Sequence, residues 1–169
     1  MSESNTHTRF VSLLVATTIA AYVLIALGTA VSTTGSAETC TTWPSCSSEW
    51  AVGPITSEGL LFWGHRGAAL VTAALLAGAA VAATRLDLGR ITRAGLVLAC
   101  VLFPVQIVVG AVLVVRESMV VGAVHLVLAM GIFVGLLAAL TRTLEARIER
   151  GTSNTEHASE VAPGPTVRP

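Results

Sequence analysis

Four long apolar segments constrain the fold of this chain more than any other feature. They cover residues 10–31, 60–83, 94–115 and 119–140. A helix of about 20 apolar residues is long enough to cross the hydrocarbon core of a bilayer. Backbone groups in lipid must bond within their own segment, and a barrel would instead show short alternating strands. We therefore predict an all-α integral membrane protein built as a four-helix bundle.

The composition also indicates a surface that faces lipid. Of the 169 residues, 53% are hydrophobic and 12% are charged, and the mean hydropathy is +0.76. A soluble domain carries about 25% charged residues, so this chain has too little charge to cover a surface that faces water. The formal net charge is zero and there is no basic run. We therefore expect a lipid bilayer around the protein and no nucleic-acid partner.

Arginines predict the orientation of the spans. They lie between the second and third spans and after the fourth: Arg85, Arg90, Arg93, Arg142, Arg147 and Arg150. The loop at residues 32–59 contains glutamates and no basic residue. Positive charge is concentrated on the cytoplasmic side of membrane proteins. We therefore expect a multi-pass protein of the cell membrane with both termini in the cytoplasm and loop 32–59 outside.

Three regions follow from this pattern. Residues 10–141 form the predicted four-helix transmembrane domain, which includes the outer loop. Residues 1–9 and the end of the chain contain almost no large apolar side chain, and such segments usually stay disordered. We expect a disordered N-terminus over 1–9 and a cytoplasmic, mostly disordered tail over 142–169.

Two histidines lie inside the predicted spans at matching depths. His65 is five residues into the second span and His125 is six residues into the fourth, which places both about 8–9 Å below the outer surface. Two imidazoles at one depth on different helices can bind the opposite faces of one haem, and Arg66 can pair with a haem propionate. The residues therefore predict a haem-iron site. The alternative is that the histidines are packed polar residues and Arg66 snorkels to the surface.

The outer loop contains two cysteines, Cys40 and Cys46, within the segment Cys-Thr-Thr-Trp-Pro-Ser-Cys. Outside the cell membrane, a pair at this spacing can form a disulfide. Such a bridge is either structural or an exchangeable pair that passes electrons. The third cysteine, Cys100, lies in the third span, where we expect it to pack.

Other small and polar residues in the spans leave two interpretations open. Gly131 and Gly135 form a GxxxG pair on the fourth span, which serves either packing inside the bundle or a homo-oligomer interface. Gln106 on the third span needs a hydrogen-bond partner, either in the bundle or on a cofactor.

Taken together, these residues resemble one half of the haem A synthase family. The matching segments follow the family's order over about residues 30–140: Thr34-Gly35-Ser36, Cys40 to Cys46, His65-Arg66, Gln106 to Gly110 and Val124-His125-Leu126. Family members usually contain two fused four-helix halves, and this chain resembles the cysteine-bearing N-terminal half.

The resemblance implies a chemistry and a set of partners. It implies an oxidoreductase of haem A biosynthesis that oxidises the methyl group of haem O to a formyl group. The expected haems are a b-type haem, haem O as substrate, or both. The expected partners are a second copy of the chain, a haem O synthase, or factors for cytochrome oxidase assembly.

One position departs from the family. The family has a glutamate three residues before the histidine of its second helix, where this chain has Phe62. Glu58, two turns earlier on the same face, is then the candidate catalytic residue. The alternative function is a non-catalytic haem-binding or electron-transfer protein that assists oxidase assembly. A third hypothesis is a structural membrane subunit without haem.

Overall fold

The computed structural model describes residues 3–40, 42–46 and 55–161, and every regular element within them is a helix. The long helices are α1 (Glu3–Thr33), α2 (Ser57–Ala83), α3 (Arg90–Arg116) and α4 (Met119–Val161), with a short 3-10 helix η1 (Ser36–Thr39) after α1. Each of the four is long and apolar enough to cross a membrane. The prediction of an all-α, four-helix membrane protein is therefore confirmed, and the chain is a multi-pass membrane protein.

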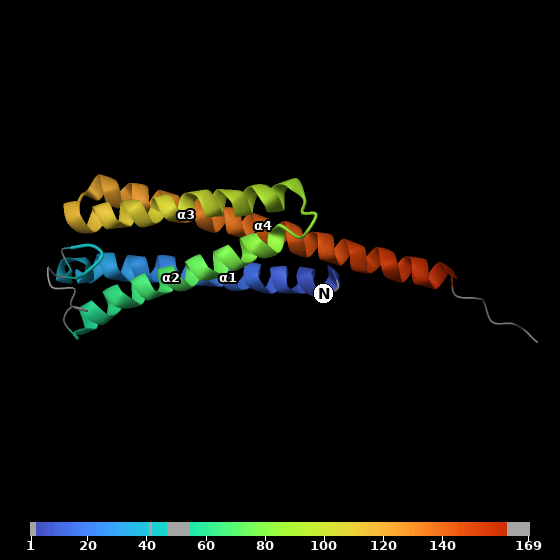
Figure 1. Cartoon of the computed structure of the whole chain (residues 1–169), viewed down its shortest axis with the longest axis horizontal. Helices are drawn as coiled ribbons and strands as arrows, with labels where there is room; N and C mark the ends of the chain where they lie inside the picture. The colour runs from blue at the N-terminus through green and yellow to red at the C-terminus, as the bar shows by residue number, and fades with distance from the viewer. Residues whose placement is uncertain (1–2, 41, 47–54, 162–169) are drawn as a thin grey trace, which may run out of the picture.

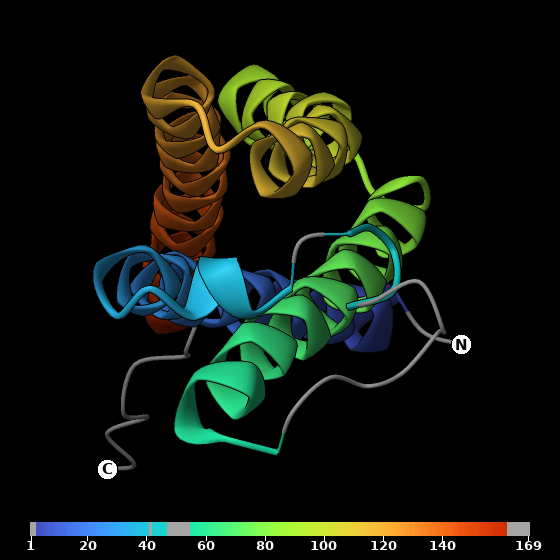
Figure 2. The same ribbon diagram turned by 90° about the vertical axis from the view of Figure 1, so that its left-hand side faces the viewer.

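The four helices form two antiparallel pairs (Figure 1). Helix α1 packs along α2 and α3 packs along α4, whereas α2 and α3 barely touch. The pairs meet mainly through α1 and α4, where the ring centres of Tyr22 and Phe133 are 6.2 Å apart. The end-on view shows the two pairs on opposite sides of the bundle (Figure 2). The loop after α1 and the turn between α3 and α4 lie at one end, which we call the loop end.

Apolar side chains form two separate clusters along the bundle. The larger cluster lies toward the end opposite the loop and includes Phe10, Leu14, Leu76, Leu96, Phe103, Ile132 and Leu136. The smaller cluster lies under the loop and consists of Val31, Cys40, Cys46 and Phe62. On α2, His65 and Arg66 of the predicted haem site fall between Phe62 of the smaller cluster and Leu76 of the larger one.

Helices α3 and α4 approach each other closely through glycines. A methyl group built on Gly95 would lie 2.3 Å from the carbonyl oxygen of Gly135, and one on Gly131 would lie 3.1 Å from the side chain of Leu102. Only Glu117 and Ser118 separate the two helices, and Glu117 adopts a positive φ of 44° to make the turn. The GxxxG pair therefore faces α3 and serves packing within this chain.

The helices extend farther at both ends than the apolar segments predict. Helix α1 begins at Glu3 and α4 continues to Val161, in regions where composition predicts disorder. Beyond the span, α4 contains good helix formers, and Arg142 forms an ion pair with Glu145 at 3.0 Å, one turn along. Arg150 also contacts the His7 ring of α1 at 3.0 Å. These contacts continue the helix past the apolar stretch.

Candidate functional site

Unpartnered polar atoms gather in the half of the bundle nearer the loop. Among the described residues, five side-chain polar atoms are buried without a hydrogen-bond partner: Trp63 Nε1, His65 Nδ1, Arg66 Nη2, Gln106 Oε1 and His125 Nδ1. A buried polar atom without a partner costs about 1–3 kcal/mol. Buried polar groups in native proteins are nearly always paired, so each exception needs an explanation. A shared ligand would supply partners for several of them at once.

His65 lies on α2 and faces α1. A methyl group built on Gly28 of α1 would be 3.0 Å from Cε1 of the imidazole. Because Gly28 has no side chain, the ring can settle directly against the backbone of α1. The histidine is half-buried.

His125 lies on α4 and repeats this arrangement against α3. A methyl group built on Gly110 would be 2.9 Å from Cε1 of His125. Gln106 lies one turn before Gly110, on the same face of α3. The two predicted ligands thus come one from each helix pair, and each lies against a glycine of the neighbouring helix.

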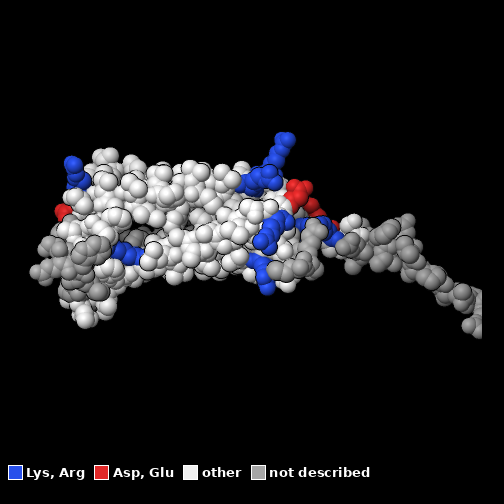
Figure 3. Space-filling view, in the orientation of Figure 1, with Lys and Arg blue, Asp and Glu red and all other residues white. Residues whose placement is uncertain are grey.

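The two histidines also lie at similar depth. His65 is the ninth residue of α2 and His125 the seventh of α4, so both lie about 9–12 Å from the helix ends at the loop end. The space-filling view shows a hollow between the two helix pairs toward this end (Figure 3). Two open grooves of about 490 and 520 Å³ lie at the opposite end and include neither histidine.

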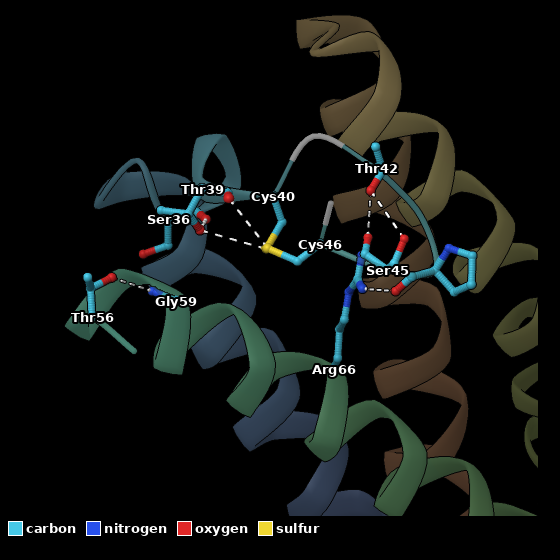
Figure 4. The surroundings of a disulfide bond; sticks show 10 residues. Ser36, Thr39, Cys40, Thr42, Ser45, Cys46, Thr56, Gly59 and Arg66 are labelled. Carbon is cyan, nitrogen blue, oxygen red and sulfur yellow. Dashed lines mark hydrogen bonds between the residues drawn. A yellow bond between two sulfur atoms is a disulfide. The ribbon is translucent and has the colours of Figure 1, made fainter. Parts of the chain in front are cut away.

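Arg66 does not extend freely to the surface. Its Nη1 donates to the carbonyl oxygen of Pro44 in the loop after α1 (Figure 4). Its guanidinium carbon lies 4.4 Å from the ring centre of Phe62 and 5.3 Å from that of Trp63. An arginine over aromatic faces gains cation–π attraction. The charge is therefore fixed next to His65 with one nitrogen still unpartnered.

The cysteines close the loop above this site. Cys40 and Cys46 form a disulfide, and Cys40 is fully buried against the apolar cluster under the loop. Within the ring, the Thr42 hydroxyl donates to the carbonyl oxygen of Ser45 at 2.9 Å (Figure 4). The disulfide thus fixes the short segment whose carbonyl oxygen accepts from Arg66.

Glu58 is the one predicted site residue that the structure does not bring to the histidines. Its side chain is exposed and accepts a hydrogen bond from the Ser57 hydroxyl at 3.0 Å. Phe62, which is 4% exposed, occupies the next turn of the same helix face toward His65. The carboxylate of Glu58 therefore faces away from the site.

Two contributors to the site were not predicted from the sequence. Trp63 was not predicted as a site residue, yet its Nε1 is buried and unpartnered. Gly28 was not considered, yet it is the residue against which His65 packs. The spacing held no signal for Gly28, which lies three residues from the end of its predicted span, whereas His65 lies five residues into its own.

The arrangement fits a flat iron porphyrin. Two imidazoles from opposite sides can ligate one iron, and the glycines behind them leave room that a methyl group would fill. An arginine at the same level suits a carboxylate. Among the described residues there is no cluster of three or more His, Cys, Asp or Glu that could hold a bare metal ion. The residues present therefore fit a haem.

The chain is similar to curated proteins whose names state a reaction on haem. The chain is 43% identical over 149 residues to the protoheme IX farnesyltransferase of Halobacterium salinarum, a match that covers 85% of this chain and 31% of that protein. It is 37% identical over 149 residues to the one of Haloarcula marismortui, covering 86% of this chain and 30% of that protein. A further relative, from Natronomonas pharaonis, is 33% identical over 157 residues, a match that covers 33% of that protein. These relatives are named as farnesyltransferases.

The chain spans about a third of the length of the curated relatives it matches. No family model matches the chain. The names of the relatives state that they transfer a farnesyl group to protoheme IX. Haem is thus the substrate of the relatives.

This finding corrects the chemistry predicted from the sequence. The identification with the haem A synthase family is wrong, because the relatives are named protoheme IX farnesyltransferase. A farnesyltransferase is a transferase, so the predicted oxidoreductase activity and the oxidation of haem O to haem A are wrong as well. The residues behind that resemblance are ones that would hold a haem, and they do not specify which of its bonds is changed.

Proposed function

We propose that this chain holds protoheme IX between its two helix pairs, with His65 and His125 as axial ligands of the iron. The observation that carries this proposal is the symmetrical placement of the two imidazoles. Each comes from a different helix pair, lies against a glycine and has a buried, unpartnered Nδ1. Ligating histidines use one ring nitrogen for the metal and the other for an oriented hydrogen bond.

In this proposal the haem is a substrate held for farnesyl transfer. Support comes from the similarity to protoheme IX farnesyltransferases over most of this chain. Because the match covers about a third of each relative, we assign to this chain the part of the work that binds and orients the porphyrin. Holding a reactant at a fixed depth and angle lowers the entropic cost of a bimolecular reaction. From the arginine distribution, the site would lie near the extracytoplasmic surface.

Absorption spectroscopy of the purified chain during titration with ferric protoheme IX tests the ligands. We expect the spectrum of low-spin iron with two imidazole ligands. His65→Ala and His125→Ala should each remove it and weaken binding by about tenfold or more. His7→Ala is the matched control, because that imidazole lies at the opposite end, beside Arg150. A two-imidazole spectrum that survives in both site variants would refute the proposal.

Chromatography of the bound haem tests the substrate. Protein purified without a farnesyl donor should release protoheme IX. Co-expression with a complete protoheme IX farnesyltransferase should add a more hydrophobic, farnesylated haem to the extract. Recovery of a different tetrapyrrole alone would contradict the assignment to farnesyl transfer, while leaving the two histidines as haem ligands.

A further inference from the structure

Two unpartnered donors lie next to each other beside His65. Trp63 Nε1 and Arg66 Nη2 are both buried without an acceptor. The guanidinium carbon of Arg66 is 5.3 Å from the ring centre of Trp63, so the donors belong to one small region. A buried donor without an acceptor is costly, and a charged one more so. The pair is therefore arranged for an acceptor that the described part of the chain does not supply.

The surroundings of Arg66 fix its position without neutralising its charge. Pro44 accepts from Nη1 with a neutral carbonyl oxygen, and Phe62 offers an aromatic face 4.4 Å from the guanidinium carbon. Among the described residues, no carboxylate pairs with Arg66. A glutamate in place of Phe62 would form an internal ion pair, whereas an aromatic ring attracts the cation and leaves its charge available. The remaining nitrogen is thus kept for an anion.

We propose that Arg66 Nη2 and Trp63 Nε1 together bind a carboxylate of the haem, namely one propionate. A carboxylate has two oxygens and can accept from both donors at once. Arg66 follows His65 directly in the sequence, so the propionate subsite and the proposed iron ligand are neighbours on α2. This inference rests on the proposed function and adds an orientation. The propionate edge of the porphyrin faces the disulfide loop, and the opposite edge points deeper into the bundle.

The disulfide loop takes part through Pro44, which lies between Cys40 and Cys46. Because the disulfide closes this segment, the carbonyl oxygen of Pro44 is held in place, and Nη1 of Arg66 with it. The other nitrogen then points in a fixed direction. A preorganised donor binds its acceptor more tightly because less freedom is lost on binding.

Protoheme IX and its dimethyl ester, in which both propionates are esterified, separate this inference from general haem binding. Their affinities would be measured in nanodiscs of neutral lipid, for the wild-type chain and for variants. Esterification should weaken binding to the wild type about tenfold, the worth of a charge-assisted hydrogen bond. Esterification should change the affinity of Arg66→Gln by less than about twofold. For Trp63→Phe, the loss of affinity on esterification should lie between these two values. Phe62→Glu should also lose the discrimination, because the new carboxylate would neutralise Arg66.

Arg116→Gln is the matched control. Arg116 ends α3 at the loop end, so this variant removes the same charge from the same end of the molecule. It should keep the wild-type discrimination between haem and ester.

The outcomes distinguish the inference from the function on which it rests. Equal effects of esterification in the wild type and in Arg66→Gln, with a histidine-dependent spectrum retained, would overturn the inference alone. Failure of the wild type to bind haem would overturn both. Absence of discrimination, together with a loss of haem affinity when phosphatidylglycerol is added, would assign the two donors to a lipid phosphate and overturn the propionate.

Discussion

The two helix pairs present a histidine in the same way but are held together by different means. In each pair, the imidazole of the second helix lies against a glycine of the first, Gly28 for α1–α2 and Gly110 for α3–α4. The α3–α4 pair is joined by a two-residue turn and by backbone contact at Gly95. The α1–α2 pair is joined by a long loop, and within this loop a disulfide links Cys40 to Cys46.

This difference separates two tasks in the site. The shared contacts between imidazole and glycine set the positions of the proposed iron ligands. The loop, with Arg66 and Trp63 below it, adds recognition of charge on one side only. The α3–α4 pair thus acts as a rigid frame, and the α1–α2 pair carries the features that distinguish one edge of a ligand from the other.

The largest expected effect concerns the rigid frame. Gly95→Leu should destabilise the protein by about 3 kcal/mol or more, because no side chain fits between Gly95 and the Gly135 carbonyl oxygen and the helices must separate. Thermal unfolding in detergent, followed by circular dichroism, measures this. Gly64→Leu is the control, since a methyl group built on Gly64 meets open space. An unchanged Tm for Gly95→Leu would show that the α3–α4 pair is not held by this contact.

An intermediate effect is expected from the loop. Replacing Cys40 and Cys46 by serine should cost about 2 kcal/mol, because the unfolded chain regains the freedom that the short closed ring removes. Reducing agent should shift the unfolding of the wild type by the same amount and leave the double variant unchanged. Cys100→Ser, which removes the free cysteine, controls for the loss of a thiol. Equal stability of the wild type and the double variant would place the strength of the α1–α2 pair in its helix packing.

The smallest effect tests whether the two contacts between an imidazole and a glycine are equivalent. Gly28→Ala and Gly110→Ala should each weaken binding of protoheme IX about five- to tenfold, equivalent to about 1 kcal/mol, because the new methyl group displaces a ring by a few tenths of an ångström. Haem titration followed by absorption measures both. Gly122→Ala is the control, since its methyl group would make only ordinary contact, 3.8 Å from Leu113. Clearly unequal losses at Gly28 and Gly110 would show that the two imidazoles are not equivalent.

The architecture was predictable because it depends on the lengths of the apolar segments and on the positions of residues within them. The length of the apolar segments gives the four helices, and the positions of His65 and His125 within those segments give their depth. Which way a side chain faces depends on the rotation of each helix about its axis. That rotation is set by contacts such as Gly95 against Gly135, so the packing of His65 on Gly28 and the buried Nε1 of Trp63 could not be derived from spacing.

The ends of the helices and the reaction were harder to predict, for different reasons. Composition predicts disorder after residue 141, but local pairs such as Arg142 with Glu145 and contact with α1 continue the helix. The oxidoreductase chemistry was wrong because it was inferred from residues that would hold a haem. Such residues constrain the shape and charge of a ligand, whereas the bond that changes depends on groups that meet its reacting edge.

Both ends of the four-helix unit lie at the same end of the molecule, opposite the loop (Figure 1). An even number of crossings returns a chain to the side of the membrane from which it entered. A unit of this kind can be joined to a longer membrane protein, before or after it, without turning the rest of that protein upside down. The match to this chain covers about a third of each relative. A unit with an even number of crossings can be gained or lost in evolution while the neighbouring spans keep their orientation in the membrane.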